Sequence, residues 1–263
     1  MKVVFIGAGN LATQLSVSMQ KAGYGIMQVY SRTEESASVL AGRLGCSYVT
    51  SLESVITDAD IYVVALKDSA LVELLPQITD GKSEKALFVH TAGSIPMTIW
   101  EGYVGHYGVF YPMQTFSKVR DVDFRTIPVF IEAKQTADLE LLKNIGGTLS
   151  ETVLEADSEQ RRYLHLSAVF VCNFANHMFT VGERLLQEHH LPFNVMYPLL
   201  KETTEKVLSG INPSEAQTGP AVRYDENVMS KHIQLLSAHP AWQHLYEDIS
   251  KSIYHDKLRL EEN

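Results

Sequence analysis

Cysteine is scarce in this chain of 263 residues, because Cys46 and Cys172 are the only two and they stand far apart in the sequence. No Cys-x-x-Cys pair occurs, so the sequence predicts neither a zinc ribbon nor a disulfide framework. The 10 histidines form no His-Glu-x-x-His or other closely spaced ligand set, and we expect no metal site. Two reduced thiols are typical of a cytoplasmic chain.

Positive charge is also in short supply. The chain has 22 Lys and Arg against 31 Asp and Glu, which gives a net charge of −9 with histidine neutral. We therefore expect no nucleic-acid partner and no binding to an anionic membrane surface. With 45% hydrophobic and 20% charged residues, the composition is that of an ordinary globular protein.

Long uninterrupted apolar runs are missing. The run at residues 3–6 is too short for the hydrophobic region of a secretory signal. The longest apolar stretch, residues 164–181, contains His165, Ser167 and Asn173, which would be costly in lipid. This stretch predicts a buried helix of a soluble protein rather than a membrane span.

The first part of the chain alternates short β-rich runs with amphipathic stretches. This alternation predicts a parallel sheet with right-handed helical crossovers. The expected strands are 3–6, 26–30, 61–66, 86–89, 108–110, 129–131 and 148–153, and the expected helices are 11–22, 34–44, one capped by Asp68, and 136–145.

The second part of the chain contains no strand pattern. Helices are expected at 158–189, 194–208, 226–238 and 241–258. We therefore place a domain boundary near residue 154 and predict an all-α domain over residues 154–263, which would hold the substrate and form a dimer.

A glycine-rich turn follows the first predicted strand and opens the first predicted helix. In it Gly7 permits a tight turn, Gly9 lets backbone amides approach a pyrophosphate, and the positive end of the helix attracts an anion. The turn, with Ala8, Asn10 and Leu11, predicts a dinucleotide site, although a turn that binds nothing has the same pattern. Residues 1–153 are accordingly predicted to be an α/β Rossmann domain with a mostly parallel, doubly wound sheet.

The end of the second strand distinguishes the two nicotinamide dinucleotides. An NAD site places an acid there to bind the ribose hydroxyls, but this chain reads Ser31, Arg32 and Thr33, with no acid before Glu34. Arg32 could bind a 2′-phosphate through two hydrogen bonds, with hydroxyl donors from its neighbours. We therefore favour NADP over NAD; the alternative is a solvated surface arginine.

These motifs resemble the Rossmann domains of pyrroline-5-carboxylate reductase and of the 6-phosphogluconate dehydrogenase-like superfamily. Further segments are similar to a bacterial group of Rossmann-like oxidoreductases whose C-terminal half is a helical domain of unknown function. The resemblance implies an NADP-type cofactor, a dimerising helical domain and no settled substrate. It rests on residues 7–12, 31–33, 59–68, 90–94, 111–116, 163–168, 173–174 and 218–223.

Two positions depart from the pattern of this group. Many relatives have Ser-Gly where this chain has Ala92 and Gly93, and its serine, Ser94, comes one place later. A substrate contact that this serine makes in relatives therefore cannot be assigned directly to Ser94. Tyr224 stands where a glycine is usual, so the turn after Arg223 is expected to differ.

Ligands of open parallel sheets sit beyond the carboxyl ends of the strands. Leu66, Lys67 and Thr91 lie at such ends and are expected to flank a nicotinamide, although simple strand-to-helix connections would look the same. Ser94 and Gln114, in the loops that follow two strands, are candidate substrate contacts.

The long helix near the domain boundary carries the candidate catalytic pair. His165 could exchange the proton that accompanies hydride transfer, and Asn173, two turns on, could orient a carbonyl or imine. A buried, hydrogen-bonded structural pair is the alternative. Arg223 could bind a substrate carboxylate, or form a surface ion pair with Asp225.

We thus predict an NADP(H)-dependent oxidoreductase that transfers a hydride to or from a C=O or C=N group of a small substrate in a cleft between the domains. A homodimer through the helical domain is expected. Two alternatives remain: an NADP-binding sensor or scaffold without turnover, and an enzyme that uses a reduced deazaflavin.

Overall fold

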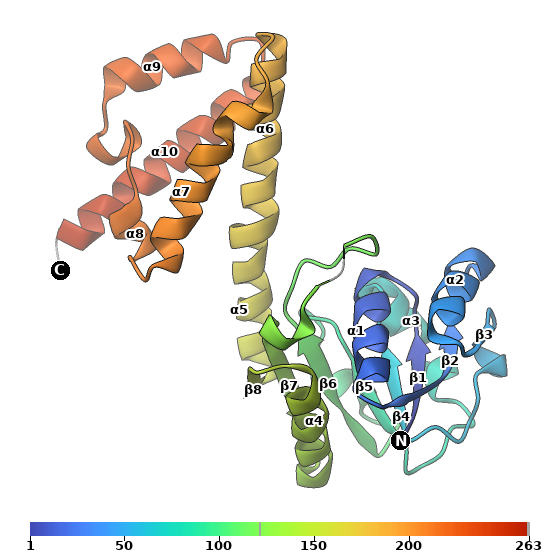
Figure 1. Cartoon of the computed structure of the whole chain (residues 1–263). Helices are drawn as coiled ribbons and strands as arrows, with labels where there is room; N and C mark the ends of the chain where they lie inside the picture. Colours follow the sequence, from blue (N-terminus) through green and yellow to red (C-terminus); the bar gives the residue numbers. More distant parts are fainter. Residues whose placement is uncertain (121, 262–263) are drawn as a thin grey trace. The chain divides into compact units, whose positions relative to one another are not determined.

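The computed structural model describes residues 1–120 and 122–261 (Figure 1). Eight strands form one sheet in the order β3-β2-β1-β4-β5-β6-β7-β8, and every neighbouring pair is parallel except β6 and β7. The strands are β1 Lys2–Ile6, β2 Gly25–Tyr30, β3 Ser47–Val49, β4 Ile61–Val64, β5 Leu87–His90, β6 His106–Pro112, β7 Val129–Ala133 and β8 Val153–Glu155. The predicted fold class, a mostly parallel Rossmann sheet followed by helices, is confirmed.

Both faces of the sheet are covered, which explains why its central strands are continuously apolar. In β1, Val3 and Phe5 belong to one buried cluster and Val4 and Ile6 to the other. Helices α1 (Asn10–Lys21), α2 (Glu34–Leu44) and α4 (Thr136–Leu149) contribute to the first cluster, whereas α3 (Asp68–Thr79) contributes to the second. The sheet order reverses between β1 and β4, so ligand-binding loops are expected at the carboxyl ends of these strands.

The rest of the chain is helical. Asp157 caps α5 in a capping box with Gln160, and α5 continues into a π-helical segment and then α6. The elements are α5 Ser158–Ala168, the π-helical segment Val169–Phe174, α6 Ala175–Glu188, α7 Tyr197–Leu208, α8 Pro213–Ala216, α9 Glu226–Leu235 and α10 Pro240–Glu261. The long helix therefore ends close to where the sequence pattern places its end.

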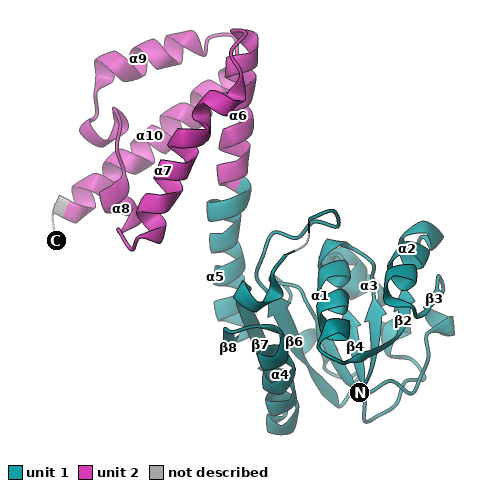
Figure 2. Ribbon diagram, viewed as in Figure 1, with its two compact units in different colours: residues 1–173 teal, residues 174–263 magenta. Residues whose placement is uncertain are grey.

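Two compact units make up the chain, Met1–Asn173 (unit 1) and Phe174–Asn263 (unit 2) (Figure 2). The sequence pattern places a boundary near residue 154, where strands give way to helices. The units instead divide inside the π-helical segment, so α5 belongs to the unit that contains the sheet.

Four local features differ from the sequence prediction. Strand β3 was not expected, the last strand begins at Val153 rather than at residue 148, and α4 extends to Leu149. Lys67, not Asp68, is the N-cap of α3, because Asp68 is already the first helical residue. Each difference concerns an element end or a three-residue strand, where local preference is weak.

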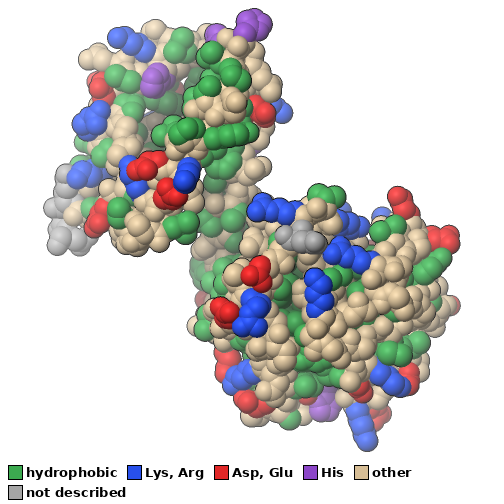
Figure 3. All heavy atoms as spheres, in the orientation of Figure 1, with side chains coloured by type: hydrophobic (Ala, Val, Ile, Leu, Met, Phe, Trp, Pro, Cys, Tyr) green, Lys and Arg blue, Asp and Glu red, His purple; other side chains and the backbone are tan. Residues whose placement is uncertain are grey.

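The expectation that residues 164–181 are buried is wrong. The π-helical segment and α6 contain no buried residue, and Phe170 and Val171 are 61% and 72% exposed. By length and composition alone, the 31-residue helix Ser158–Glu188 could cross a membrane. Hydrophobic side chains are visible on the surface of the helical unit in Figure 3 as well.

Candidate functional site

The turn between β1 and α1 requires glycine at its first position. Gly7 has φ +120°, its N–H donates to the Tyr30 carbonyl at 2.8 Å, and a Cβ there would lie 2.3 Å from the Ala65 carbonyl oxygen. A side chain is therefore excluded by the backbone just after β4 as well as by the dihedral angle. This close approach fixes where α1 begins.

Gly9 has no such structural requirement. It is the N-cap of α1, its φ is −78°, and a Cβ there would meet no protein atom within 4 Å. The first turn of α1 has no acidic residue and no side-chain cap, so its N–H groups can bind an anion. The space at Gly9 is open, and of its neighbours in the turn Ala8 is buried and Leu11 half-buried.

The side chain of Asn10 contacts a loop that the sequence did not indicate. Its side-chain amide donates to the Phe116 carbonyl at 3.0 Å, and one turn later the amide of Gln14 donates to the carbonyls of Ser117 and Arg120 at 2.7 and 3.1 Å. These bonds hold the loop after β6 against the first turns of α1. Asn10 can therefore offer its backbone N–H to a phosphate, while its side chain is engaged by the loop.

The end of β2 is open on the side of Arg32. The Ser31 N–H donates to the Val49 carbonyl at 3.2 Å, Thr33 is the N-cap of α2, and Arg32 is exposed. Within the described part of the chain, no hydrogen bond or ion pair holds the Arg32 guanidinium. The nearest acid, Glu34, accepts a hydrogen bond from the Tyr48 hydroxyl at 3.1 Å.

The loop after β5 meets the start of α3 through a hydrogen bond that the Ser94 hydroxyl donates to the Asp68 carboxylate. The Thr91 N–H donates to the Val64 carbonyl at 3.2 Å, which keeps the two strand ends parallel beyond the sheet. Leu66 is half-buried and Lys67 is exposed beside them. These predicted residues thus lie at one edge of the sheet.

His165 lies against the loop after β5. A Cβ on Gly93 would come within 2.7 Å of the His165 ring, so only glycine allows this contact. The Tyr111 hydroxyl, at the end of β6, lies 3.1 Å from His165 Nδ1. Burial raises the pKa of Tyr111, opposed by the positive charge of Arg161, so its phenol is protonated at neutral pH.

A cavity of about 350 Å³ opens beside this pair and is formed wholly by residues of unit 1. Among its walls it brings together three predicted residues, His165, Asn173 and Gln114. The other lining residues are Tyr111, Met113, Thr115, Leu164, Ser167, Ala168, Val169, Val171 and Cys172. The size is that of a small-ligand pocket.

The π-helical segment supplies one wall of this cavity. In an α-helix, Asn173 would be rotated by roughly 80° from His165. A π-helix turns less per residue, which brings Asn173 back toward the His165 face, and such segments are frequent at functional sites. His165 and Asn173 are both exposed, so the alternative of a buried structural pair is wrong.

Neither Ser94 nor Arg223 lines that cavity. Arg223 belongs to unit 2, where it is exposed at the end of a 3₁₀ turn, Ala221–Arg223. The next residue, Tyr224, has the left-handed angles φ 49° and ψ 48° that a glycine would adopt, and its ring packs on Tyr254 at 4.6 Å. The Tyr224 substitution therefore leaves this turn in a glycine-like conformation.

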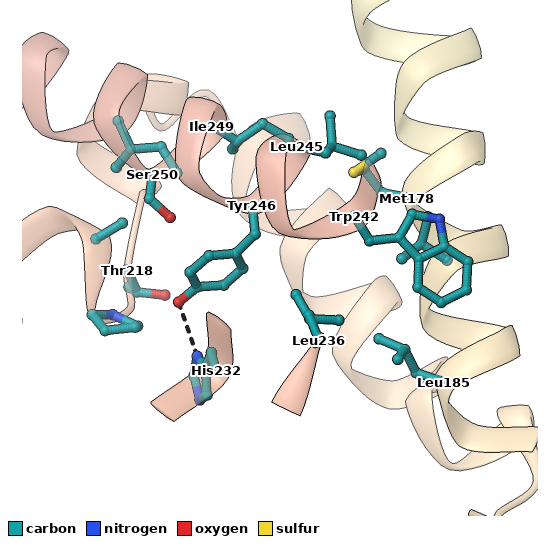
Figure 4. Close-up of a pocket in the computed structure, with 14 residues that line it drawn as sticks. Met178, Leu185, Thr218, His232, Leu236, Trp242, Leu245, Tyr246, Ile249 and Ser250 are labelled. Carbon is teal, nitrogen blue, oxygen red and sulfur yellow. Dashed lines mark hydrogen bonds between the residues drawn. The ribbon is translucent and has the colours of Figure 1, made fainter. Parts of the chain in front are cut away.

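Unit 2 has an apolar cavity of its own, of about 380 Å³ (Figure 4). Met178 and Leu185 of α6 face Trp242 and Leu245 of α10 across it. Its polar lining consists of Thr218, Ser250 and the pair His232–Tyr246, which is joined by a 2.9 Å hydrogen bond. In the described ranges, 1–120 and 122–261, no cluster of three or more His, Cys, Asp or Glu could hold a metal ion.

Comparison with known proteins divides the chain between residues 93 and 127, within unit 1. Residues 2–93 match the family model described as NADP oxidoreductase coenzyme F420-dependent, and residues 127–253 match a domain of unknown function, DUF2520. The chain is 26% identical over 106 residues to pyrroline-5-carboxylate reductase of Pseudomonas aeruginosa, a match that spans 39% of that enzyme.

Solved structures extend the likeness to the whole chain. A Bacteroides fragilis protein classed among NADP oxidoreductases is 57% identical, with TM-score 0.93, over 97% of this chain and 98% of that one. An imine reductase of Myxococcus stipitatus in complex with NADP⁺ shares the fold at 14% identity and TM-score 0.65, over 100% and 94% of the two chains.

Proposed function

Because the chain belongs to the family in which an NADP oxidoreductase domain is joined to DUF2520, we propose that it is an NADP(H)-dependent reductase of a small carbonyl or imine compound. The observation that carries this proposal is the His165–Tyr111 pair beside a ligand-sized cavity, in the same unit as the dinucleotide turn. When bound, the cofactor supplies the hydride.

The cofactor-binding residues have distinct tasks in this proposal. The N–H groups at the start of α1 bind the pyrophosphate, with Gly9 leaving it room. The exposed Arg32 guanidinium binds the 2′-phosphate, and the hydroxyls of Ser31 and Thr33 lie on either side of it in sequence. Leu66, Lys67 and Thr91, at the ends of β4 and β5, flank the nicotinamide.

His165 is the proton donor in this proposal. In the imidazolium form of His165, Nδ1–H donates to the Tyr111 oxygen and Nε2 carries the second proton, whose release leaves a neutral imidazole. From Nε2 this proton can pass to the oxygen or nitrogen that gains charge as the substrate is reduced. Asn173 and Gln114 supply amides that orient the substrate, and their place in the cavity lining supports this role.

Binding and turnover are tested separately. Calorimetric titration with NADPH and NADH measures cofactor binding, and no heat with either at high micromolar concentration would end the proposal. With a panel of aldehydes, ketones and cyclic imines, His165→Ala should keep the NADPH affinity and lower kcat roughly 10²-fold or more, in the range of general acid catalysis. His177→Ala, at an exposed position of α6, is the matched control.

Two alternatives predict different readouts. A sensor without turnover would bind NADPH and oxidise it with no member of the panel. The description of the matched family model names coenzyme F420, a deazaflavin, which favours testing a deazaflavin as hydride donor. A deazaflavin-dependent enzyme would bind the reduced deazaflavin. The absorbance of the deazaflavin would then change during turnover, whereas NADPH would support no turnover.

We further propose that the protein acts as a homodimer through its helical part and works in the cytoplasm. The exposed apolar side chains of the long helix support the first statement, because surfaces of this kind are usually covered in solution. The free thiols of Cys46 and Cys172 support the second. Arg223 remains a candidate for binding a substrate carboxylate.

A further inference from the structure

Arg161, in the first turn of α5, is a fully buried arginine that the sequence did not single out. Its Nη1 donates to the Glu132 carboxylate of β7 at 2.5 Å. Its Nη2 donates to the Ile95 carbonyl at 2.6 Å and its Nε to the Ala92 carbonyl at 3.3 Å. One guanidinium thus joins a helix, a strand and the loop after β5.

Ser158 strengthens the same junction. Its hydroxyl donates to the Glu132 carboxylate at 2.9 Å, accepts a hydrogen bond from the Met97 N–H at 2.9 Å, and lies 3.3 Å from Arg161 Nη2. The loop from Ala92 to Met97 is therefore tied to the start of α5 at three backbone groups.

This junction sets the position of the candidate catalytic histidine. His165 follows Arg161 by four residues, so the two side chains lie on the same face of α5. Gly93 lies next to Ala92, whose carbonyl Arg161 holds, and Gly93 is the residue that the His165 ring contacts. A shift of the loop relative to α5 would change this contact and the His165–Tyr111 distance together.

Stability alone does not explain the pair. Burying two charges costs several kcal/mol in desolvation, and well-packed apolar residues often stabilise a fold as well or better. An apolar pair could not hold the two carbonyls of the loop at a fixed spacing. The planar guanidinium can, because its donors are arranged in a rigid fork.

We infer that Arg161 is a positioning residue for the proposed reduction, which holds the loop Ala92–Ile95 against α5 so that His165, Tyr111 and the end of β5 keep their mutual distances. The importance of those distances for catalysis rests on the proposed function. The arrangement itself is testable without a substrate.

The decisive variant is the double substitution Arg161→Met with Glu132→Leu, which leaves no unpaired buried charge. Removing both charges avoids leaving one buried ion unpaired, and the melting temperature shows whether the variant is folded. Arg162→Met, at the exposed neighbouring position, is the matched control. Arg161→Lys, whose ammonium can pair with Glu132 but cannot span both carbonyls, is the second test variant.

Three readouts distinguish positioning from a merely structural role. We expect the double variant and Arg161→Lys to lose the parent shift of the His165 Nδ1 nitrogen resonance, to exchange the Met97 amide at least tenfold faster, and to bind NADPH as the parent does. Where the parent turns over a substrate, kcat should fall at least tenfold with little change in the KM for NADPH.

A folded double variant or Arg161→Lys variant that keeps the parent His165 resonance and Met97 exchange rate would overturn the inference. If the parent reduces no substrate, the proposed function fails, but the resonance and exchange measurements still decide the role of Arg161. Loss of the parent His165 Nδ1 shift in Arg162→Met would also count against the inference, because the effect would then not be specific to the buried Arg161 guanidinium.

Discussion

At the scale of single residues, Arg32 offers the sharpest test of cofactor choice. It is exposed just after the end of β2, and Glu34, the acid that follows it, accepts a hydrogen bond from Tyr48. Arg32→Ala should weaken NADPH binding about 10- to 100-fold, since a charge-assisted contact contributes roughly 1.5–3 kcal/mol. NADH binding should stay the same.

Calorimetric titration of both cofactors measures this difference. Arg43→Ala, in the last turn of α2, controls for the loss of a positive charge from the helix that follows Arg32. Equal losses for NADPH and NADH, or none for either, would show that Arg32 does not contact the 2′-phosphate.

His90, at the end of β5, is a residue that the sequence analysis passed over. Its ring is completely buried, and burial, with the charge of Arg161, lowers its pKa from 6.5 to about 3. Unfolded chains bind a proton near pH 6.5 whereas native chains bind it only near pH 3. The free energy of unfolding should therefore fall as the pH is lowered through this window, by up to about 1.4 kcal/mol per pH unit.

Urea titrations at pH 7, 6 and 5 measure that slope. His90→Gln, which does not titrate, should show a shallower fall over the same range, whatever its stability at pH 7. Parallel slopes for the parent and the variant would mean that His90 is protonated in the native state or exposed to solvent.

At the scale of elements, the β1–α1 turn separates folding from binding. Gly7→Ala should destabilise the chain, because its Cβ would collide with the Ala65 carbonyl and its φ is unfavourable for a side chain. Gly9→Ala should leave the melting temperature within a few degrees, since its Cβ meets no protein atom. It should nonetheless weaken NADPH binding at least tenfold by filling the space of the pyrophosphate.

Thermal unfolding and titration of the two variants check both halves of this prediction. Gly42→Ala, in α2, where a Cβ also meets no protein atom, is the control for binding. Undiminished NADPH affinity in Gly9→Ala would place the dinucleotide elsewhere.

Elements were predictable from the sequence where a periodic pattern extends over several residues, as in α1, α2 and β4. Strand β3 was not, because Ser47–Val49 is too short to show alternation, and its pairing with β2 depends on a distant segment. The antiparallel pairing of β7 with β6 was also not predictable, since strand direction is a property of the assembled sheet. Among site residues, the glycine turn and His165 have local signals.

Tyr111 and Arg161 lack such signals. An arginine in the first turn of a helix is normally exposed, and only the tertiary fold places Glu132 and two loop carbonyls around this one. Tyr111 belongs to the segment 111–116 on which the resemblance rests, but only the structure brings His165 to its hydroxyl. Contacts between distant segments therefore define the part of the site that could not be predicted from the sequence.

At the scale of the whole molecule, the apolar surface of the long helix is the feature that most needs a partner. The sequence shows that this helix is apolar, but apolar character alone does not say whether the same chain or a second copy covers the helix. Leu166, Phe170, Val171, Phe174 and Phe179 all remain exposed. Two copies related by a two-fold axis would each cover the same face of the other.

This proposal predicts that a charge on the helix separates the copies. Phe179→Glu, in α6, should convert a dimer to a monomer in light scattering, or raise the dimer Kd at least 100-fold. Losing one buried phenylalanine costs about 1.5–3 kcal/mol, and burying the new carboxylate costs more. Val39→Glu, at a more exposed apolar position of α2, should leave the dimer intact. A parent chain that stays monomeric from micromolar to hundreds of micromolar would refute the homodimer, and a Phe179→Glu dimer of parent affinity would place its interface away from α6.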